Sequence, residues 1–257
     1  MKLFTRFAYS DSLHPFFTIQ DSDGEELVQL KKGESVSFAL SEESYCTTCK
    51  AKLIYGNECP ECQFKSAYGI CMRCDGKKCI QGEEGIKKNC FEREHCVYLA
   101  LFGENVKVGV SLETRFEKRL VEQGADFGVK IFKGFNGMKA REAETSLKAI
   151  GYADRFRDAQ KIEWLSQKPD ERVLHQAMKK ARLGEFKIYF AEETPVDLSS
   201  FYSIPQERLL AAESLAGKIE GWKGSLLFLR QNGVCKTYPA KTALGRMVLE
   251  NTLASFG

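Results

Sequence analysis

The sequence lacks several features that would place the protein in a specialised class. No apolar run approaches the roughly 18–20 residues that a membrane-spanning helix needs, so we expect no membrane association. The first ten residues contain neither a long apolar core nor a small-residue cleavage site, and a secretory signal is not expected. There is no internal repeat and no low-complexity tract. These absences predict a cytoplasmic, globular protein.

A strong overall charge is also missing, because the net charge is only +3. The charge is unevenly spread, however. Residues 1–45 hold 4 Lys/Arg against 8 Asp/Glu, whereas residues 107–190 hold 18 against 12, a local balance of +6. This excess favours nucleic acid as an anionic partner of the middle of the chain. A solvated helical surface would give the same balance, so charge alone does not decide between the two.

Cysteine is abundant and concentrated. Nine of the ten cysteines lie between Cys46 and Cys96, and only Cys235 is isolated. In a cytoplasmic chain, cysteines in CxxC pairs indicate metal binding rather than disulfides. The segment 46–96 has little apolar periodicity, so we expect it to depend on metal for folding.

Two CxxC pairs open this segment, Cys46-Thr-Thr-Cys49 and Cys59-Pro-Glu-Cys62, with nine residues between them. Each pair turns both thiolates toward one point, and two pairs complete a tetrahedral site of four sulfurs, the arrangement typical of structural zinc. Reduced free cysteines or a redox pair are the alternative, but they rarely show this spacing. The sequence therefore predicts zinc on Cys46, Cys49, Cys59 and Cys62.

A second set offers six ligands for four positions. The third pair is Cys71-Met-Arg-Cys74, and Cys79, Cys90, His95 and Cys96 follow. We predict a second metal site on Cys71, Cys74, Cys79 and Cys90, with His95 and Cys96 as alternative ligands. Zinc is expected here too, giving one or two structural zinc ions per chain. An iron–sulfur cluster is the alternative, because it also takes four thiolates.

Periodicity and turn residues predict an α+β protein in four segments. A β-rich N-terminal segment (1–45) and a β-rich C-terminal segment (191–257) together form a frame, around a cysteine-rich zinc module (46–96) and an α/β core (97–190). In the core we expect a hairpin of strands 97–101 and 106–110, a helix that ends near Gly124, a strand at 129–132, and helices at about 138–150, 154–166 and 169–183.

The core carries a series of separate signals: Val97-Tyr98-Leu99 on one strand, Lys107-Val108-Gly109 on the next, Arg119 on the first helix and Glu144 on a later one. This order resembles the GIY-YIG nuclease fold. Tyr98 matches the tyrosine of the first motif of that family, and Gly109 matches the glycine of the second. Lys107 stands where the family has a second tyrosine, and Gln123 where it often has histidine.

The resemblance implies phosphodiester hydrolysis, with Tyr98, Lys107, Arg119 and Glu144 as catalytic residues. Glu144 would hold one Mg²⁺ or Mn²⁺, Tyr98 with Lys107 would handle the proton of the attacking water, and Arg119 would neutralise charge. We expect nucleic acid to contact Lys107, Arg115, Lys118 and Arg119. The alternative is a non-catalytic interaction module that keeps the fold, in which Arg119 and Glu144 form a structural ion pair and Tyr98 is a core aromatic.

A second resemblance spans most of the chain. The stretch from His95 to Ala100, the strand around Lys107 and the run Arg119-Leu-Val-Glu-Gln-Gly-Ala125 are similar to the domain-of-unknown-function family 2797, as are Gly221-Trp-Lys-Gly224 and Asn232-Gly-Val234. The resemblance implies a zinc-cysteine module before a GIY-YIG-like core, and makes Lys107 a feature of the family. It supports the architecture more than any activity.

Overall fold

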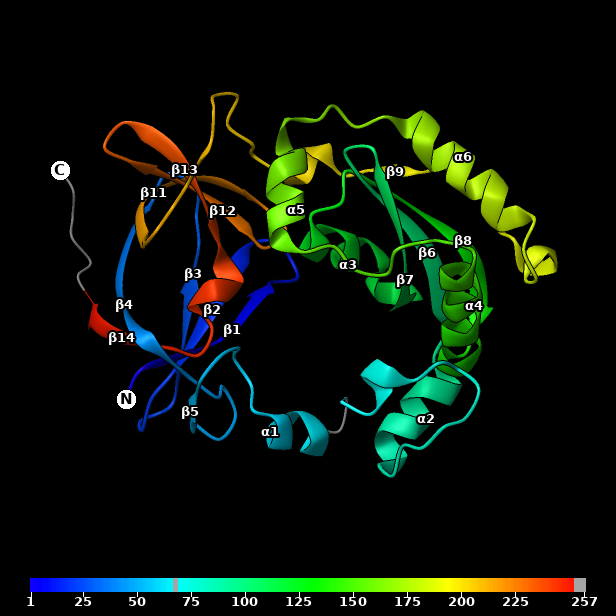
Figure 1. Ribbon diagram of the computed structural model, residues 1–257, viewed down its shortest axis with the longest axis horizontal. Helices are drawn as coiled ribbons and strands as arrows, with labels where there is room; N and C mark the ends of the chain where they lie inside the picture. The colour runs from blue at the N-terminus through cyan, green and yellow to red at the C-terminus, as the bar shows by residue number, and fades with distance from the viewer. Residues whose placement is uncertain (67–68, 252–257) are drawn as a thin grey trace. The chain divides into compact units, whose positions relative to one another are not determined.

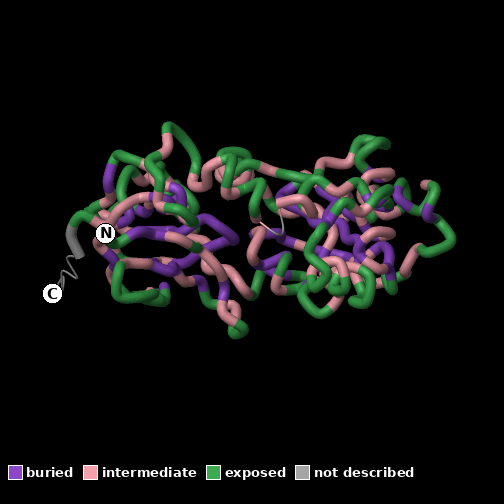
Figure 2. Tube along the Cα trace, turned by 90° about the horizontal axis from the view of Figure 1, so that it is seen from below, coloured by how far each residue is buried: buried purple, intermediate pink, exposed green. Residues whose placement is uncertain are grey.

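A computed structural model describes residues 1–66 and 69–251. The chain forms two compact units, one built from both ends (Met1–Gln63 and the segment that starts at Phe201) and one from Phe64–Ser200. In each unit the buried stretches run mainly through strands and the exposed stretches through turns (Figure 2). The architecture is mixed α+β, with one large mixed sheet and one small antiparallel sheet. None of the helices in the described part is long and apolar enough to cross a bilayer.

The unit built from both ends is a ten-stranded sheet. Nine strands follow the order β10-β13-β12-β11-β4-β14-β1-β2-β3, and the tenth, β5, pairs with β4 (Figure 1). All pairs are antiparallel except β10 with β13. The strands are β1 (Leu3–Tyr9), β2 (Pro15–Gln20), β3 (Glu25–Gln29), β4 (Ser35–Tyr45), β5 (Lys52–Leu53), β10 (Leu210–Ala211), β11 (Leu215–Lys223), β12 (Leu226–Gln231), β13 (Val234–Pro239) and β14 (Arg246–Asn251). A 3₁₀ turn, η6 (Ala240–Ala243), precedes β14.

Aromatic side chains fill the middle of this sheet. Phe4 packs edge-on against Phe17 and Phe38, at 4.9 and 5.2 Å between ring centres. The hairpin of β12 and β13 turns at Asn232 and Gly233, which both have positive φ, at 51° and 78°. Strand β12 begins two residues after Gly224, because Gly224 forms the tight turn after β11 with φ of 58°.

The second unit contains a four-stranded antiparallel sheet in the order β7-β6-β8-β9. Its strands are β6 (His95–Phe102), β7 (Asn105–Leu112), β8 (Phe127–Phe135) and β9 (Val196–Asp197). Its helices are α2 (Glu84–Glu92), α3 (Phe116–Gln123), α4 (Gly137–Ala149), α5 (Asp158–Glu163) and α6 (Glu171–Arg182). Short turns complete it: η1 (Cys71–Arg73), η2 (Glu113–Arg115), η3 (Trp164–Ser166), η4 (Lys187–Tyr189) and η5 (Ser199–Phe201). Helix α1 (Pro60–Lys65) joins the two units.

Strand β6 is buried on both faces, which explains its continuous apolar sequence. Val97, Leu99 and Leu101 point into a core shared with helices α4 and α6. The alternate residues point to the other face, where Tyr98 packs against Phe116 of α3. Figure 1 shows α3 and α4 on opposite sides of β6 and β7. Helix α3 ends at Gly124, which is left-handed (φ 78°) and returns its N–H to the carbonyls of Leu120 and Val121.

The helix expected at 154–166 is shorter than predicted. Residues 151–156 run beside the edge strand β7 instead, where Ala153 forms a parallel bridge with Lys107 and accepts a hydrogen bond from Val108 N at 2.8 Å. The backbone groups of an exposed sheet edge need partners, and this segment supplies them. Helix α5 therefore begins only at Asp158.

Candidate functional site

Four cysteines in the unit built from both ends form a group able to hold a metal ion. The Sγ atoms of Cys46, Cys49, Cys59 and Cys62 all lie within 4.8 Å of one another. The Sγ atoms of Cys49 and Cys59 are 3.8 Å apart. Four thiolates at about 2.3 Å from one zinc ion are about 3.8 Å from each other. The thiols therefore already have the spacing of a tetrahedral site.

Backbone turns create this spacing. After Cys46, Lys50 takes a left-handed conformation (φ 63°) and its N–H bonds to the carbonyl of Cys46 at 2.9 Å. The N–H of Cys59 points at Cys46 Sγ and the N–H of Cys62 at Cys59 Sγ, both at 3.4 Å. These donors stabilise thiolates, the form that binds metal.

Backbone N–H donors also change the pKa values of the thiols. Burial alone would raise the pKa of Cys46, but N–H groups of Cys49, Cys59 and Thr48 lower it to about 6. The pKa of Cys62 is raised instead, first because its thiol hydrogen-bonds Cys59. Opposite shifts within one group mean that the thiols share negative charge, which a divalent cation would neutralise.

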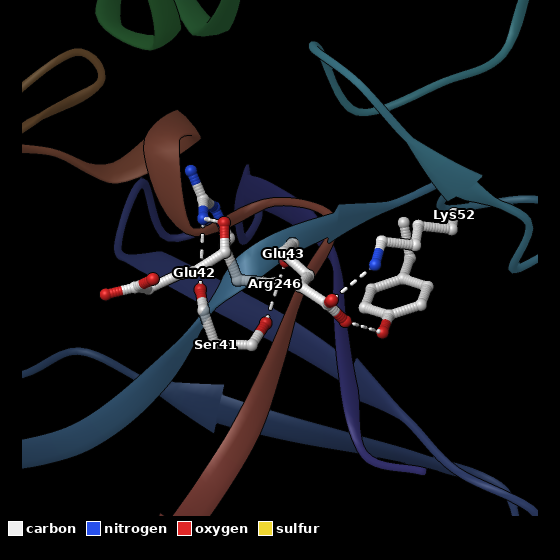
Figure 3. Close-up of polar contacts among 6 residues, drawn as sticks. Ser41, Glu42, Glu43, Lys52 and Arg246 are labelled. Carbon is white, nitrogen blue, oxygen red and sulfur yellow. Dashed lines mark hydrogen bonds and ion pairs between the residues drawn. The ribbon is translucent and has the colours of Figure 1, made fainter.

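Strand β4 leads into the first cysteine pair, and side-chain contacts tie it to its neighbours β14 and β5, as Figure 3 shows. Arg246 Nη1 on β14 donates to the backbone carbonyl of Ser41, at 3.0 Å, and to that of Glu42. Lys52 on β5 forms an ion pair with Glu43 on β4. The ion pair is exposed and adds little stability, so of these two side-chain contacts that of Arg246 adds more to the pairing of β4 with β14.

The second cysteine set lies in the other unit. Cys71, Cys74, Cys79 and Cys90 line one pocket of about 200 Å³, together with His95, Met138 and Arg141 among others. Cys96 does not line it: strand alternation turns Cys96 to the opposite face of β6, where burial raises the pKa of its thiol to about 12. Unlike the first four, these cysteines are not drawn into one tight group.

The predicted catalytic residues lie on the hairpin strands β6 and β7 and on the helices α3 and α4. Tyr98 lies opposite Gly109 in the hairpin. A Cβ atom at Gly109 would be 2.5 Å from the Cζ and Oη of Tyr98, so the phenol ring lies flat over this residue. Gln123 Nε2 donates to Tyr98 Oη at 2.8 Å. The Oε1 of Gln123 is buried without a partner in the part of the chain that the structure describes, so it can accept from a water or a ligand there.

Lys107 shares this face of the hairpin, two residues from Gly109. It is 9% exposed, and its Nζ donates to the backbone carbonyl of Asp154 at 3.0 Å. Burial, with Arg119 and Lys161 nearby, lowers the pKa of Lys107 to about 8. A lysine with such a pKa can act as a base near neutral pH.

Arg119 does not form the ion pair with Glu144 that was the structural alternative. Its Nη1 is 3.6 Å from an oxygen of Glu122, and the other oxygen of Glu122 is 3.0 Å from Arg115 Nη2. One carboxylate therefore holds two of the expected nucleic-acid-binding residues. Lys118, on the same helix α3, is half-buried.

Glu144 is partly buried on α4 and forms no hydrogen bond or ion pair with any residue that the structure describes. Burial raises its pKa, and Lys148, Arg141 and Lys107 oppose that rise. Glu144 also acts on the pKa values of Tyr98 and Lys107, as does Arg119. Tyr98 and Lys107 therefore each feel the charges of Arg119 and Glu144. A lone carboxylate in such a place can hold Mg²⁺ or Mn²⁺, which usually take only one or two protein carboxylates.

Sequence reasoning missed several residues of this site. Gln123 was noted only as a departure from the histidine of the nuclease pattern, although that position was the one available signal. Glu122 was also missed, although it lies three residues after Arg119 on the same helix, a spacing that favours an ion pair. Nothing in the sequence indicated Asp154, whose backbone carbonyl accepts from Lys107. The role of Asp154 depends on how distant segments meet, which spacing does not record.

The fold and the cysteine group define an α+β protein with a candidate metal centre. The family described as "Protein of unknown function (DUF2797)" matches residues 33–240, and the chain belongs to this family. Searches of the curated proteins and of the solved structures gave no match.

Proposed function

We propose that the protein binds nucleic acid at the site formed by Tyr98, Lys107, Arg119 and Glu144 and hydrolyses a phosphodiester there. Four residues singled out by their order in the sequence lie on two strands and two helices, and nothing local forces them together. The observation that carries the proposal is the carboxylate of Glu144, which is partly buried and has no partner in the described part of the chain, although three cations and one further carboxylate, Asp154, act on its pKa. An unpaired buried charge is costly, so it suggests a ligand.

The resemblance to the GIY-YIG fold supports the same assignment, and the small antiparallel sheet with flanking helices is compatible with it. A divalent ion held by Glu144 would supply Lewis-acid stabilisation of the phosphate. Arg119 would place positive charge beside the phosphate oxygens. Arg115 and Lys118 on α3 would contact the phosphate backbone.

Lys107 is the better general base in this proposal. Burial raises the pKa of Tyr98, so the phenol stays protonated at neutral pH. Neutral Lys107 would take a proton from the attacking water as the new P–O bond forms and the bond to the leaving oxygen breaks. Tyr98 is 1% exposed and held by Gln123, and we assign it a positioning role.

The four cysteines Cys46, Cys49, Cys59 and Cys62 would hold one structural zinc ion in this protein. Their spacing fits zinc, and no open coordination position is needed for such a role. We expect zinc to hold the turns in place and to take no part in the reaction.

A cleavage assay tests the function. Purified protein with Mg²⁺ or Mn²⁺ should cut single- or double-stranded DNA or RNA, and Glu144→Gln should lower the rate at least 100-fold. Glu142→Gln is the matched control: it makes the same change on an exposed position of the same helix, and should keep the rate. Binding without cleavage in all three proteins would instead favour the non-catalytic interaction module. Absence of both binding and cleavage would end the proposal.

A further inference from the structure

We propose that the pocket lined by Cys71, Cys74, Cys79 and Cys90 holds an iron–sulfur cluster, distinct in kind from the compact group at Cys46. The pocket belongs to the second unit alone. The inference is independent of the proposed function and of the zinc site, and it concerns metal chemistry at residues to which the nuclease proposal gives no role.

The four thiols come from three successive pieces of chain. Cys71 and Cys74 flank the turn η1, Cys79 lies in the following loop, and Cys90 is on helix α2. Although up to ten residues separate neighbouring cysteines, all four face one cavity of about 200 Å³. This segment has few apolar residues that could hold its fold together by packing. Four cysteines that converge in such a segment therefore indicate a metal centre.

Two glycines bring the cysteine segments against helix α4. A Cβ atom at Gly76 would lie 2.3 Å from Glu142 N and 2.5 Å from Met138 O, so the loop between Cys74 and Cys79 presses directly on the helix backbone. A Cβ atom at Gly137 would lie 2.5 Å from Cys90 Sγ. Both contacts are possible only because glycine has no side chain, so the cysteine segments pack closely against helix α4.

The spacing of the thiols argues for a cluster. A single zinc ion draws its four sulfurs to about 3.8 Å from one another. The first cysteine group comes close to this, with one pair at 3.8 Å and all four Sγ atoms within 4.8 Å of one another. In the second set, all of whose members are described, no three ligand atoms come within 4.8 Å of one another. In an iron–sulfur cluster each thiolate binds one iron atom of a sulfide-bridged core, and the four thiolates are distributed over two or four irons. The ligand sulfurs therefore stand farther apart than around a single metal ion.

The lining suits a negatively charged cluster. Gln81, itself 7% exposed, donates its Nε2 to Cys71 Sγ at 3.3 Å. Arg141 and Lys87 add positive charge, and Met138 contributes an apolar wall whose sulfur lies 3.8 Å from Cys74 Sγ. Hydrogen bonds to cluster sulfurs and shielding from water are the means by which proteins tune such centres.

His95 is an alternative ligand for the cluster. Its Nδ1 is 2.8 Å from the carbonyl oxygen of Arg93, which can only accept, so Nδ1 carries the proton and Nε2 keeps a free lone pair. Histidine replaces cysteine on one iron in some clusters, where it raises the reduction potential. His95 lines the pocket beside Cys90.

The test is elemental and spectroscopic, on the full chain purified without oxygen and reconstituted with ferric iron, sulfide and a thiol reductant. We expect about two or four irons per chain with matching acid-labile sulfide and a brown chromophore, beside one zinc ion. Cys74→Ser should lose most of the iron and keep the zinc, whereas Cys59→Ser should lose the zinc and keep the iron. Cys96→Ala, a buried cysteine outside the pocket, should keep both.

If Cys74→Ser does not fold, Gln81→Leu gives a second readout, because it keeps all four thiolates but removes the donor to Cys71. It should shift the midpoint potential of the cluster without changing the iron content. Two zinc ions and no iron after reconstitution would overturn the inference in favour of a second mononuclear site. A chain with one zinc ion and no other metal would also overturn it. Neither result depends on whether nucleic acid is cleaved.

Discussion

Gln123 holds the hydroxyl of Tyr98 from 25 residues away in sequence, its Nε2 donating to Oη at 2.8 Å. The phenol is almost fully buried, so this donor cannot be replaced by bulk water. Because Tyr98 Oη is the acceptor in this bond, its own proton remains available for donation to another group. In the proposed site, the interaction sets both the position of the ring and the direction in which it can donate.

Gln123→Leu should therefore destabilise the protein by about 1–3 kcal/mol, because it strands a buried hydroxyl. Chemical denaturation of both proteins measures this cost. Gln123→His keeps a donor at the position where the nuclease pattern often has one, and should recover most of the stability and any cleavage. Equal losses in the two variants would show that the site needs the shape of glutamine and not its N–H group.

Gly109→Ala tests the contact between the hairpin strands. The new Cβ would lie 2.5 Å from the ring of Tyr98, which has no room to move. We expect a loss of about 1–3 kcal/mol in the free energy of unfolding, as for other overpacked cores. Gly85→Ala is the control, because its Cβ position has no atom of the described residues within 4 Å apart from those of its own stretch of helix α2. A Gly109→Ala variant as stable as the control would mean that the ring does not rest on this residue.

The sequence predicted best what is local. The spacing of Cys46, Cys49, Cys59 and Cys62 fixes their convergence because each pair is one turn, and that grouping is confirmed. The hairpin of β6 and β7 was predicted for the same reason. Strand β3 was missed because it is mostly exposed, with Leu27 at 64%, and so carries little apolar pattern.

The rest depends on contacts between segments far apart in the sequence. The partner of Lys107 is 47 residues away, on a segment predicted to be helical that instead covers the sheet edge. The pattern of apolar residues does not indicate that this segment runs along the sheet edge. The choice between Glu122 and Glu144 as partner of Arg119 likewise follows from the packing of α3 on the sheet, although Glu122 was the nearer carboxylate by helical spacing.

Removal of metal should loosen the paired-cysteine turns and little else in their unit. Coordination supplies on the order of 10 kcal/mol in isolated zinc modules. After chelation, amide hydrogen exchange should accelerate at Cys59 and Cys62, whose N–H groups point at sulfur. The hairpin of β12 and β13 serves as an internal control and should stay protected. Unchanged exchange at the two cysteines would show that packing alone holds the turns.

Glu122→Gln should strengthen nucleic-acid binding. Glu122 neutralises both Arg115 and Arg119, so its removal frees two cations for phosphate. We expect affinity at low salt to rise roughly three- to tenfold, with a steeper dependence on salt. Fluorescence anisotropy with labelled DNA and RNA measures both. Glu117→Gln is the same change on the same helix, at a carboxylate that forms no ion pair with the residues that the structure describes, and should have a smaller effect. Equal effects would assign the change to net charge.

The pH dependence of stability provides a direct test of Lys107. Its pKa falls from an ordinary 10.5 to about 8 in the folded protein, first because of burial. Between these two values the unfolded chain binds a proton that the folded chain does not. Stability should therefore rise as the pH increases from about 8 to 10.5, and should be lost as the pH falls through 8.

Lys107→Met isolates this effect, because methionine has a similar length and no charge. The difference in unfolding free energy between variant and wild type should change by on the order of 2–3 kcal/mol between pH 7.5 and 10.5, favouring the variant at the lower pH. Loss of the hydrogen bond to the carbonyl of Asp154 adds a constant offset of about 1 kcal/mol against the variant. Urea denaturation at a series of pH values measures the difference, and other groups that titrate in this range cancel in it. Parallel curves would show that Lys107 keeps an ordinary pKa, which would remove the physical basis for its role as a base.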